Sequence, residues 1–146
     1  MPSVSKMDTT ELVCVRVANA RGLKFGTFAS SYALRREALP SVRSIGLDEE
    51  ELMTILNRFN EAIANYWPCH AVYCFGLCCA PCTLGLSLLC PNLCVTKSEE
   101  AAKRYLEQVS LNSMWYDRHI RFRLVKTWFS SSVEVSFPRH LVMKVD

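Results

Sequence analysis

The feature that most constrains this chain is a long uncharged stretch in its middle. Between Glu61 and Lys97 the sequence has no Asp, Glu, Lys or Arg, and seven of its eight cysteines lie between Cys69 and Cys94. Apolar side chains are unstable in water, so a stretch of this length needs a core, a partner or a bilayer to cover it. The architecture of the protein has to accommodate this segment.

Length alone permits this stretch to cross a membrane, but prolines and glycines interrupt it. Residues 71–95 would extend about 37 Å as one helix, and a hydrocarbon core is about 30 Å thick. Pro81 lacks an amide proton and would break such a helix unless neighbours bonded the freed carbonyls. We therefore expect two short apolar helices in the membrane interface; a spanning helix and a buried core segment are the alternatives. The side chains expected at the interface are Tyr66, Trp67, Tyr73, Leu84, Leu86, Leu88 and Leu89.

The cysteines beside this apolar segment favour lipid attachment. The N-terminus has no apolar region typical of a secretory signal peptide, so we expect a chain that faces the cytosol, where thiols stay reduced. Such cysteines are common sites of S-palmitoylation, and each acyl chain adds about 0.8 kcal/mol per buried methylene group to membrane binding. Packing as a small apolar residue is the alternative for any single one. The candidates are Cys74, Cys78, Cys79, Cys82, Cys90 and Cys94.

A zinc-binding module is a weaker alternative for the same cysteines. Cys79 and Cys82 form a Cys-x-x-Cys pair, and the further ligands would come from Cys69, His70, Cys90 and Cys94. Structural zinc sites usually present two spaced ligand pairs on polar knuckles, whereas leucines fill the positions between these residues. We therefore expect no metal and no other cofactor.

Nothing in the sequence indicates catalysis or nucleic-acid binding. We find no nucleophile with a base, no paired carboxylates and no phosphate loop, and His70, His119 and His140 lie far apart in the sequence. The net charge of +3 and the pI of about 8.4 are too mild for a nucleic-acid footprint. These features predict a protein that binds a partner and is not an enzyme.

The segments on either side predict a single α+β domain over residues 1–146, with a small antiparallel sheet built from N- and C-terminal strands. Turn residues at 19–22 predict a hairpin in the N-terminal part, and residues 32–46 show no regular pattern. The expected strands are residues 12–17, 24–29, 120–124 and 133–137, with 141–145 as a candidate for one more.

Two amphipathic helices are expected to flank the cysteine-rich apolar segment, residues 69–96. Asp48 suits the N-cap of the first, which should run to about Trp67 and stop at Pro68. Ser98 is expected to cap the second, with two glutamates in its first turn.

Three parts of the sequence together resemble a known family. They are residues 56–60 (LNRFN), residues 82–85 (CTLG) within the cysteine-rich run, and the segment from Pro91 through Cys94 and Lys97 into a helix rich in Glu, Lys and Arg. The pattern resembles the cysteine-rich hydrophobic domain proteins. More widely, residues 12–138 are similar to the superfamily that also holds golgin subfamily A member 7 and the fungal Ras-modification accessory subunit.

The resemblance implies an α+β domain on the cytoplasmic face of Golgi, vesicle or plasma membranes, palmitoylated on its cysteine run. Its better-known members stabilise membrane palmitoyltransferases of the Asp-His-His-Cys type. This sequence has no Asp-His-His-Cys motif, so the implied role is that of a non-catalytic, stabilising subunit. A palmitoylated trafficking adaptor without an enzyme partner is the alternative within the family.

The resemblance also narrows the lipidation sites. Only Cys74, Cys78, Cys79 and Cys82 fall in the matching run. Residues 80–81, an Ala-Pro pair, interrupt what is a longer cysteine string in the family.

Overall fold

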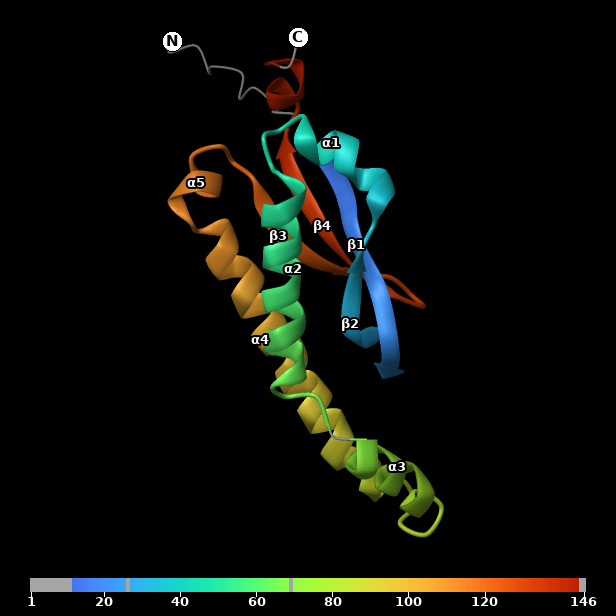
Figure 1. Cartoon of the computed structure of the whole chain (residues 1–146). Helices are drawn as coiled ribbons and strands as arrows, with labels where there is room; N and C mark the ends of the chain where they lie inside the picture. The colour runs from blue at the N-terminus through green and yellow to red at the C-terminus, as the bar shows by residue number, and fades with distance from the viewer. Residues whose placement is uncertain (1–11, 26, 69, 145–146) are drawn as a thin grey trace, which may run out of the picture.

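The structure is a computed structural model that describes residues 12–25, 27–68 and 70–144 (Figure 1). These residues form the expected α+β fold, with one antiparallel four-stranded sheet in the order β2-β1-β4-β3. The strands are β1 (Leu12–Phe25), β2 (Phe28–Leu34), β3 (Arg121–Lys126) and β4 (Ser131–Pro138). The α-helices are α1 (Leu39–Arg43), α2 (Glu49–Ala64), α3 (His70–Cys79), α4 (Leu89–Ser110) and α5 (Ser113–Tyr116). The 3₁₀ helices are η1 (Arg36–Ala38), η2 (Leu86–Leu88) and η3 (Arg139–Lys144).

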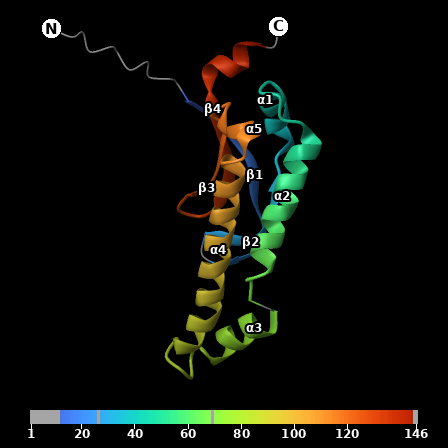
Figure 2. The same cartoon turned by 90° about the vertical axis from the view of Figure 1, so that its left-hand side faces the viewer.

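Two long helices cover one face of the sheet. Figures 1 and 2 show α2 and α4 side by side over the sheet, where α2 packs against β2 and α4 packs against β3. The first and last strands meet at the centre, because β1 pairs with β4. The core between the two layers includes Val17, Phe28, Tyr32, Phe59, Ile63, Leu106, Ile120, Val135 and Phe137.

The first strand is longer than the sequence predicts. β1 continues through residues 19–22, so the predicted turn there is wrong. Gly22 has a φ of 84°, and the register with β2 shifts between Arg21 and Lys24, which marks a bulge. A glycine at positive φ serves a bulge as well as a turn, so the residue pattern does not separate the two. The expected second strand is divided between the end of β1 and the start of β2 at Phe28.

The C-terminal strands are confirmed as β3 and β4, but two other expectations are wrong. Residues 32–46, expected to be irregular, contain the end of β2, η1 and α1. Residues 141–144 belong to η3 and not to another strand, and residue 145 lies outside the described residues.

The first long helix begins as the sequence predicts. The Asp48 carboxylate accepts hydrogen bonds from the amide of Glu49, at 2.8 Å, and from the amide of Glu51. The Glu51 carboxylate accepts in turn from the amide of Asp48 at 3.5 Å, so Asp48 and Glu51 form a capping box. α2 ends at Ala64, shortly before Pro68. The predicted N-cap is therefore confirmed, whereas the helix ends at Ala64 and not at the predicted Trp67.

The second long helix begins earlier than predicted. α4 starts at Leu89, within the uncharged stretch, so Ser98 is not its cap. Pro91 lies in the first turn of α4, where the missing amide proton costs nothing. Ser98 is fully buried instead, and its hydroxyl donates a hydrogen bond to the carbonyl of Ile63 in α2 at 3.2 Å. The predicted capping residue thus joins the two helices.

Both edge strands of the sheet are closed by a helix side chain. On β2, the Asn60 carboxamide accepts from the amide of Tyr32 at 2.8 Å and donates to the carbonyl of Tyr32 at 2.9 Å. On β3, the Ser110 hydroxyl accepts from the amide of Phe122 at 2.9 Å. Open edges attract strands from other chains, so these bonds protect the sheet from pairing at Tyr32 and Phe122.

Candidate membrane-contact site

The uncharged stretch forms a projection beyond the sheet. We call residues 70–94 the apolar tip: it comprises α3, a turn over residues 80–85, η2 and the first turns of α4. Figures 1 and 2 show the apolar tip extending past the end of the sheet, at the opposite end of the molecule from α5. Two helical arms were expected here, but the second is the start of the long α4. The apolar tip is therefore continuous with a helix whose other half packs in the core.

The chain reverses direction in the turn between α3 and the start of α4. Pro81 lies in this turn, as expected of a residue that interrupts helices. Leu84 and Gly85 both have positive φ values, 53° and 87°, and the amide of Gly85 bonds the carbonyl of Ala80 at 2.8 Å. The family-like CTLG motif thus forms the end of the apolar tip.

Polar groups in the apolar tip bond each other. The Thr83 hydroxyl donates to the carbonyl of Cys79 at 2.9 Å and accepts from the amide of Ser87 at 3.2 Å. The Ser87 hydroxyl donates to the carbonyl of Gly76 at 2.8 Å. Backbone groups need internal partners wherever water is scarce, so this arrangement suits an apolar surrounding.

α3 and the start of α4 approach each other closely at a glycine. A Cβ atom at Gly76 would lie 3.2 Å from Cγ of Pro91 and 3.2 Å from the carbonyl oxygen of Ser87. Because Gly76 has no side chain, α3 packs directly on the start of α4, and the side chains around it turn outward.

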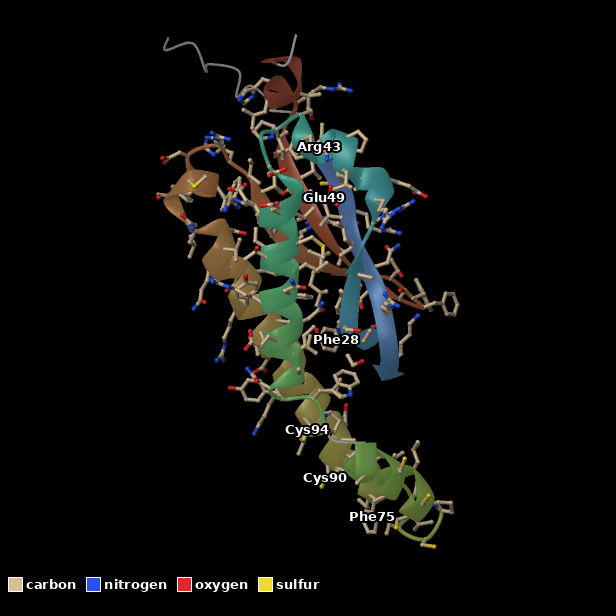
Figure 3. The ribbon with its side chains drawn as sticks, viewed as in Figure 1. Phe28, Arg43, Glu49, Phe75, Cys90 and Cys94 are labelled. Atoms are coloured by element: carbon tan, nitrogen blue, oxygen red, sulfur yellow. The ribbon has the colours of Figure 1, made fainter. Side chains whose placement is uncertain are left out.

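The outward side chains of the apolar tip are hydrophobic. Leu84 is 95% exposed and Phe75 is 69% exposed, and the tip has no Asp, Glu, Lys or Arg. Figure 3 shows Phe75 on α3 near the start of α4, which carries Cys90 and Cys94. Large apolar patches in contact with water mark sites that bind a protein or a membrane. The other exposed apolar side chains are Val72, Leu77, Leu86, Leu89 and Leu93.

The leucines predicted at a membrane interface lie on this surface. Leu84, Leu86 and Leu89 are exposed, and Leu88 is half-buried. Tyr73 lies on α3, but its side chain is outside the described part of the structure.

The two aromatic residues before the apolar tip differ in how much of each side chain is exposed. Tyr66 is 52% exposed. Trp67 is half-buried, and its ring centre lies 6.1 Å from that of Phe28 in the core. The structure therefore places Trp67 at the junction of tip and sheet, where it packs on the body of the protein.

The cysteines of the tip are reachable from outside. Cys74, Cys78, Cys82 and Cys90 are exposed, and Cys79 and Cys94 are half-buried. Within the described ranges, no three His, Cys, Asp or Glu residues come together in a way that could hold a metal ion. Two residues named for the zinc alternative are not covered by this statement, because Cys69 lies outside the described ranges and the side chain of His70 is not described.

The helical segments of the apolar tip are short compared with the thickness of a bilayer. In the part of the chain that the structure describes, no helix has both the length and the apolar character needed to cross a bilayer.

Sequence reasoning missed a second exposed apolar feature. The turn between β3 and β4 carries Trp128, 92% exposed, and Phe129, 85% exposed. The only sequence signal was the adjacency of two large aromatic residues between two predicted strands, where turns usually carry polar residues.

Fold and site together define a small α+β protein with an exposed, cysteine-rich apolar projection. Comparison of the chain with family models, curated proteins and solved structures finds no match.

Proposed function

We propose that this protein is a membrane-associated, non-catalytic subunit that stabilises a protein S-palmitoyltransferase of the Asp-His-His-Cys type. It acts on the cytoplasmic face of Golgi, vesicle or plasma membranes. The observation that carries the membrane part is the apolar tip, in which hydrophobic side chains face outward while the backbone bonds itself.

The apolar tip has enough hydrophobic surface to bind a bilayer without help. Full burial of one Leu or Phe side chain is worth about 1.5–3 kcal/mol, so full burial of six of them is worth about 9–18 kcal/mol. Partial burial at the level of the headgroups still leaves several kcal/mol. Acyl chains would make this contact more durable.

The family resemblance supports the enzyme partner. Its two short motifs have clear structural roles: in residues 56–60, Phe59 lies in the core and Asn60 closes the edge of β2, while residues 82–85 form the end of the apolar tip. These structural roles are compatible with the resemblance, and the resemblance itself carries the expectation of the enzyme partner.

Acylation can be tested by hydroxylamine-dependent thiol labelling of the membrane-extracted protein. We expect hydroxylamine to release a signal from the wild type that is lost when Cys74, Cys78, Cys79 and Cys82 are all changed to Ser. Cys14→Ser is the matched control, because Cys14 is an exposed cysteine on the sheet. A signal unchanged in the four-site variant would contradict acylation at these sites.

The partner can be tested by purification in mild detergent. We expect a membrane palmitoyltransferase to co-purify with the wild type and to lose thermal stability when this protein is removed. The variant Leu84→Ser/Leu86→Ser/Leu89→Ser should weaken this association, whereas Leu111→Ser/Met114→Ser, with two exposed apolar side chains near α5, should not.

The same exposed cysteines also suit a palmitoylated trafficking adaptor that has no enzyme partner. In that case labelling would still succeed, but no acyltransferase would be recovered and no acyltransferase would depend on this protein for stability. The two experiments together therefore separate the proposed subunit from the adaptor.

A further inference from the structure

The turn between β3 and β4 presents two aromatic side chains to solvent. Trp128 and Phe129 are 92% and 85% exposed, more than any other aromatic side chain that the structure describes. Burial of such side chains is strongly favourable, so their full exposure is a cost unless something covers them.

The turn is held firmly from within and from its neighbours. The Thr127 amide and hydroxyl both donate to the carbonyl of Ser130, at 2.7 and 3.0 Å. At the base of the turn, Lys126 bonds Glu99 of α4 at 2.5 Å, and the Ser131 hydroxyl donates to the carbonyl of Thr27 at 2.7 Å. The two aromatic residues are thus carried by an anchored turn.

The turn and the apolar tip lie on the same side of the molecule. In Figure 1 the loop between β3 and β4 extends to the right of β1, and the apolar tip lies below the sheet on the same right-hand side. Two contacts link these regions through the body: Ser131 bonds Thr27, and the neighbouring Phe28 packs its ring against Trp67 at the start of the tip. One flat surface on this side of the molecule can therefore meet both projections.

The surroundings of the turn are basic. The sequence has no carboxylate between Leu12 and Arg36 or between Arg118 and Val133. The basic residues Arg21, Lys24, Arg123 and Lys126 are exposed there. Two carboxylates face this region, and both are paired. Glu99 pairs with Lys103 and Lys126, and Glu134 lies 3.9 Å from both Arg16 and Arg123.

We propose that the Trp128–Phe129 turn is a second membrane contact, which inserts its two aromatic rings into the interface of the anionic bilayer that the apolar tip enters. Aromatic side chains favour the headgroup region, and clustered Lys and Arg attract anionic lipids. This inference rests on the membrane association in the proposed function. Two contacts on one side fix the orientation of the protein, so that the end with α5 points away from the membrane.

The test uses the full chain and vesicles of phosphatidylcholine and phosphatidylserine with brominated acyl chains, which quench tryptophan on contact. The chain has Trp67, Trp115 and Trp128, and Trp128→Phe removes the indole at the turn but keeps an aromatic ring. We expect bromine to quench the wild type and to quench Trp128→Phe much less. Equal loss of fluorescence in the two proteins would overturn the inference.

Vesicle flotation gives a second measurement. We expect Trp128→Ser/Phe129→Ser to partition into the vesicles about ten-fold more weakly than the wild type, since two aromatic side chains leave the interface. The matched control is Leu111→Ser/Met114→Ser, which replaces side chains 69% and 54% exposed near α5. The control should float like the wild type, and circular dichroism should show that both variants are folded.

The outcomes separate this inference from the proposed function. If the wild type fails to float, membrane association itself fails. If the wild type floats while Trp128 is not quenched and the turn variant floats equally well, the second contact is overturned and the apolar tip remains. If the turn variant floats normally but loses a co-purifying protein, the turn binds that protein and the inference is equally overturned.

Discussion

In the body of the protein, polar side chains join helices to the sheet and to each other, whereas in the apolar tip they bond groups within the tip itself. Asn60 joins α2 to β2 and Ser98 joins α4 to α2, while Thr83 and Ser87 bond carbonyls within the tip. The body packs a core of apolar side chains and leaves a few exposed, such as Trp128 and Phe129, whereas the tip turns most of its large apolar side chains outward. The body is thus built for water and the apolar tip for an apolar surrounding.

The largest effect is expected when the same residue type, phenylalanine, is replaced by alanine in each of the two regions. Phe59 is 1% exposed in the core and Phe75 is 69% exposed on the tip. We expect Phe59→Ala to lower the free energy of unfolding by about 3–5 kcal/mol, because it leaves a cavity. Phe75→Ala should change it by less than about 0.5 kcal/mol, as at an ordinary surface site. Denaturant unfolding measures both, and a large loss for Phe75→Ala would place the tip in the core.

The next largest effect is expected at the closed sheet edge. Asn60→Ala leaves the amide and carbonyl of Tyr32 without their side-chain partners, so we expect a loss of about 2 kcal/mol in the free energy of unfolding. Asn57→Ala is the matched control, because Asn57 lies on the exposed face of the same helix. Equal stability of the two variants would show that the edge bonds contribute nothing.

The fold could be predicted where short-range chemistry decides it. The capping box of Asp48 and the alternation in β3 and β4 depend on nearby residues, and they were predicted correctly. Ser98 and Gly22 were misassigned because their surroundings come from tertiary structure. Ser98 bonds α2, and Gly22 lies against Ser30 of the neighbouring strand, whose Oγ would be 2.6 Å from an added Cβ.

The residues of the candidate site could be predicted from the sequence, but their arrangement in space could not. The absence of charge located the tip, since uncharged runs of this length are rare in a chain of ordinary charge content. Its direction could not be read from the sequence, because the early start of α4 at Leu89 decides where the tip points. Trp128 and Phe129 were missed because exposure in a turn is a property of the folded chain.

A smaller, local effect is expected within the apolar tip. Gly85 has a φ of 87° and open space around the position of a Cβ atom. Gly85→Ala should therefore cost about 1–2 kcal/mol through backbone strain alone. Because the cost falls in the tip, we expect faster hydrogen exchange at tip amides and an almost unchanged exchange rate in the sheet. Faster exchange throughout the sheet would show that tip and body unfold together.

The smallest effect is expected at an ion pair in the body. Burial raises the pKa of Glu99, but hydrogen bonds and charges from Lys103 and Lys126 outweigh it, so that the pKa lies below its ordinary value. A lowered pKa in the folded state stabilises the protein above the pKa of the unfolded state, about 4.3. This contribution is lost as the pH falls through the folded-state pKa.

Glu99→Gln should accordingly lower the free energy of unfolding by about 0.5–1 kcal/mol at pH 7, since the pair is partly exposed. The difference from the wild type should shrink once the pH falls below the unfolded-state pKa, and it should vanish as the pH passes through the lowered folded-state pKa of Glu99. Denaturant unfolding across this pH range measures it, with Glu100→Gln as the control because the Arg104 pair at 3.9 Å is more exposed. A difference that persists at low pH would assign the loss to packing of Glu99. In that case the charge of Glu99 would not be the interaction that holds Lys126 against α4. Lys126 lies at the base of the Trp128–Phe129 turn.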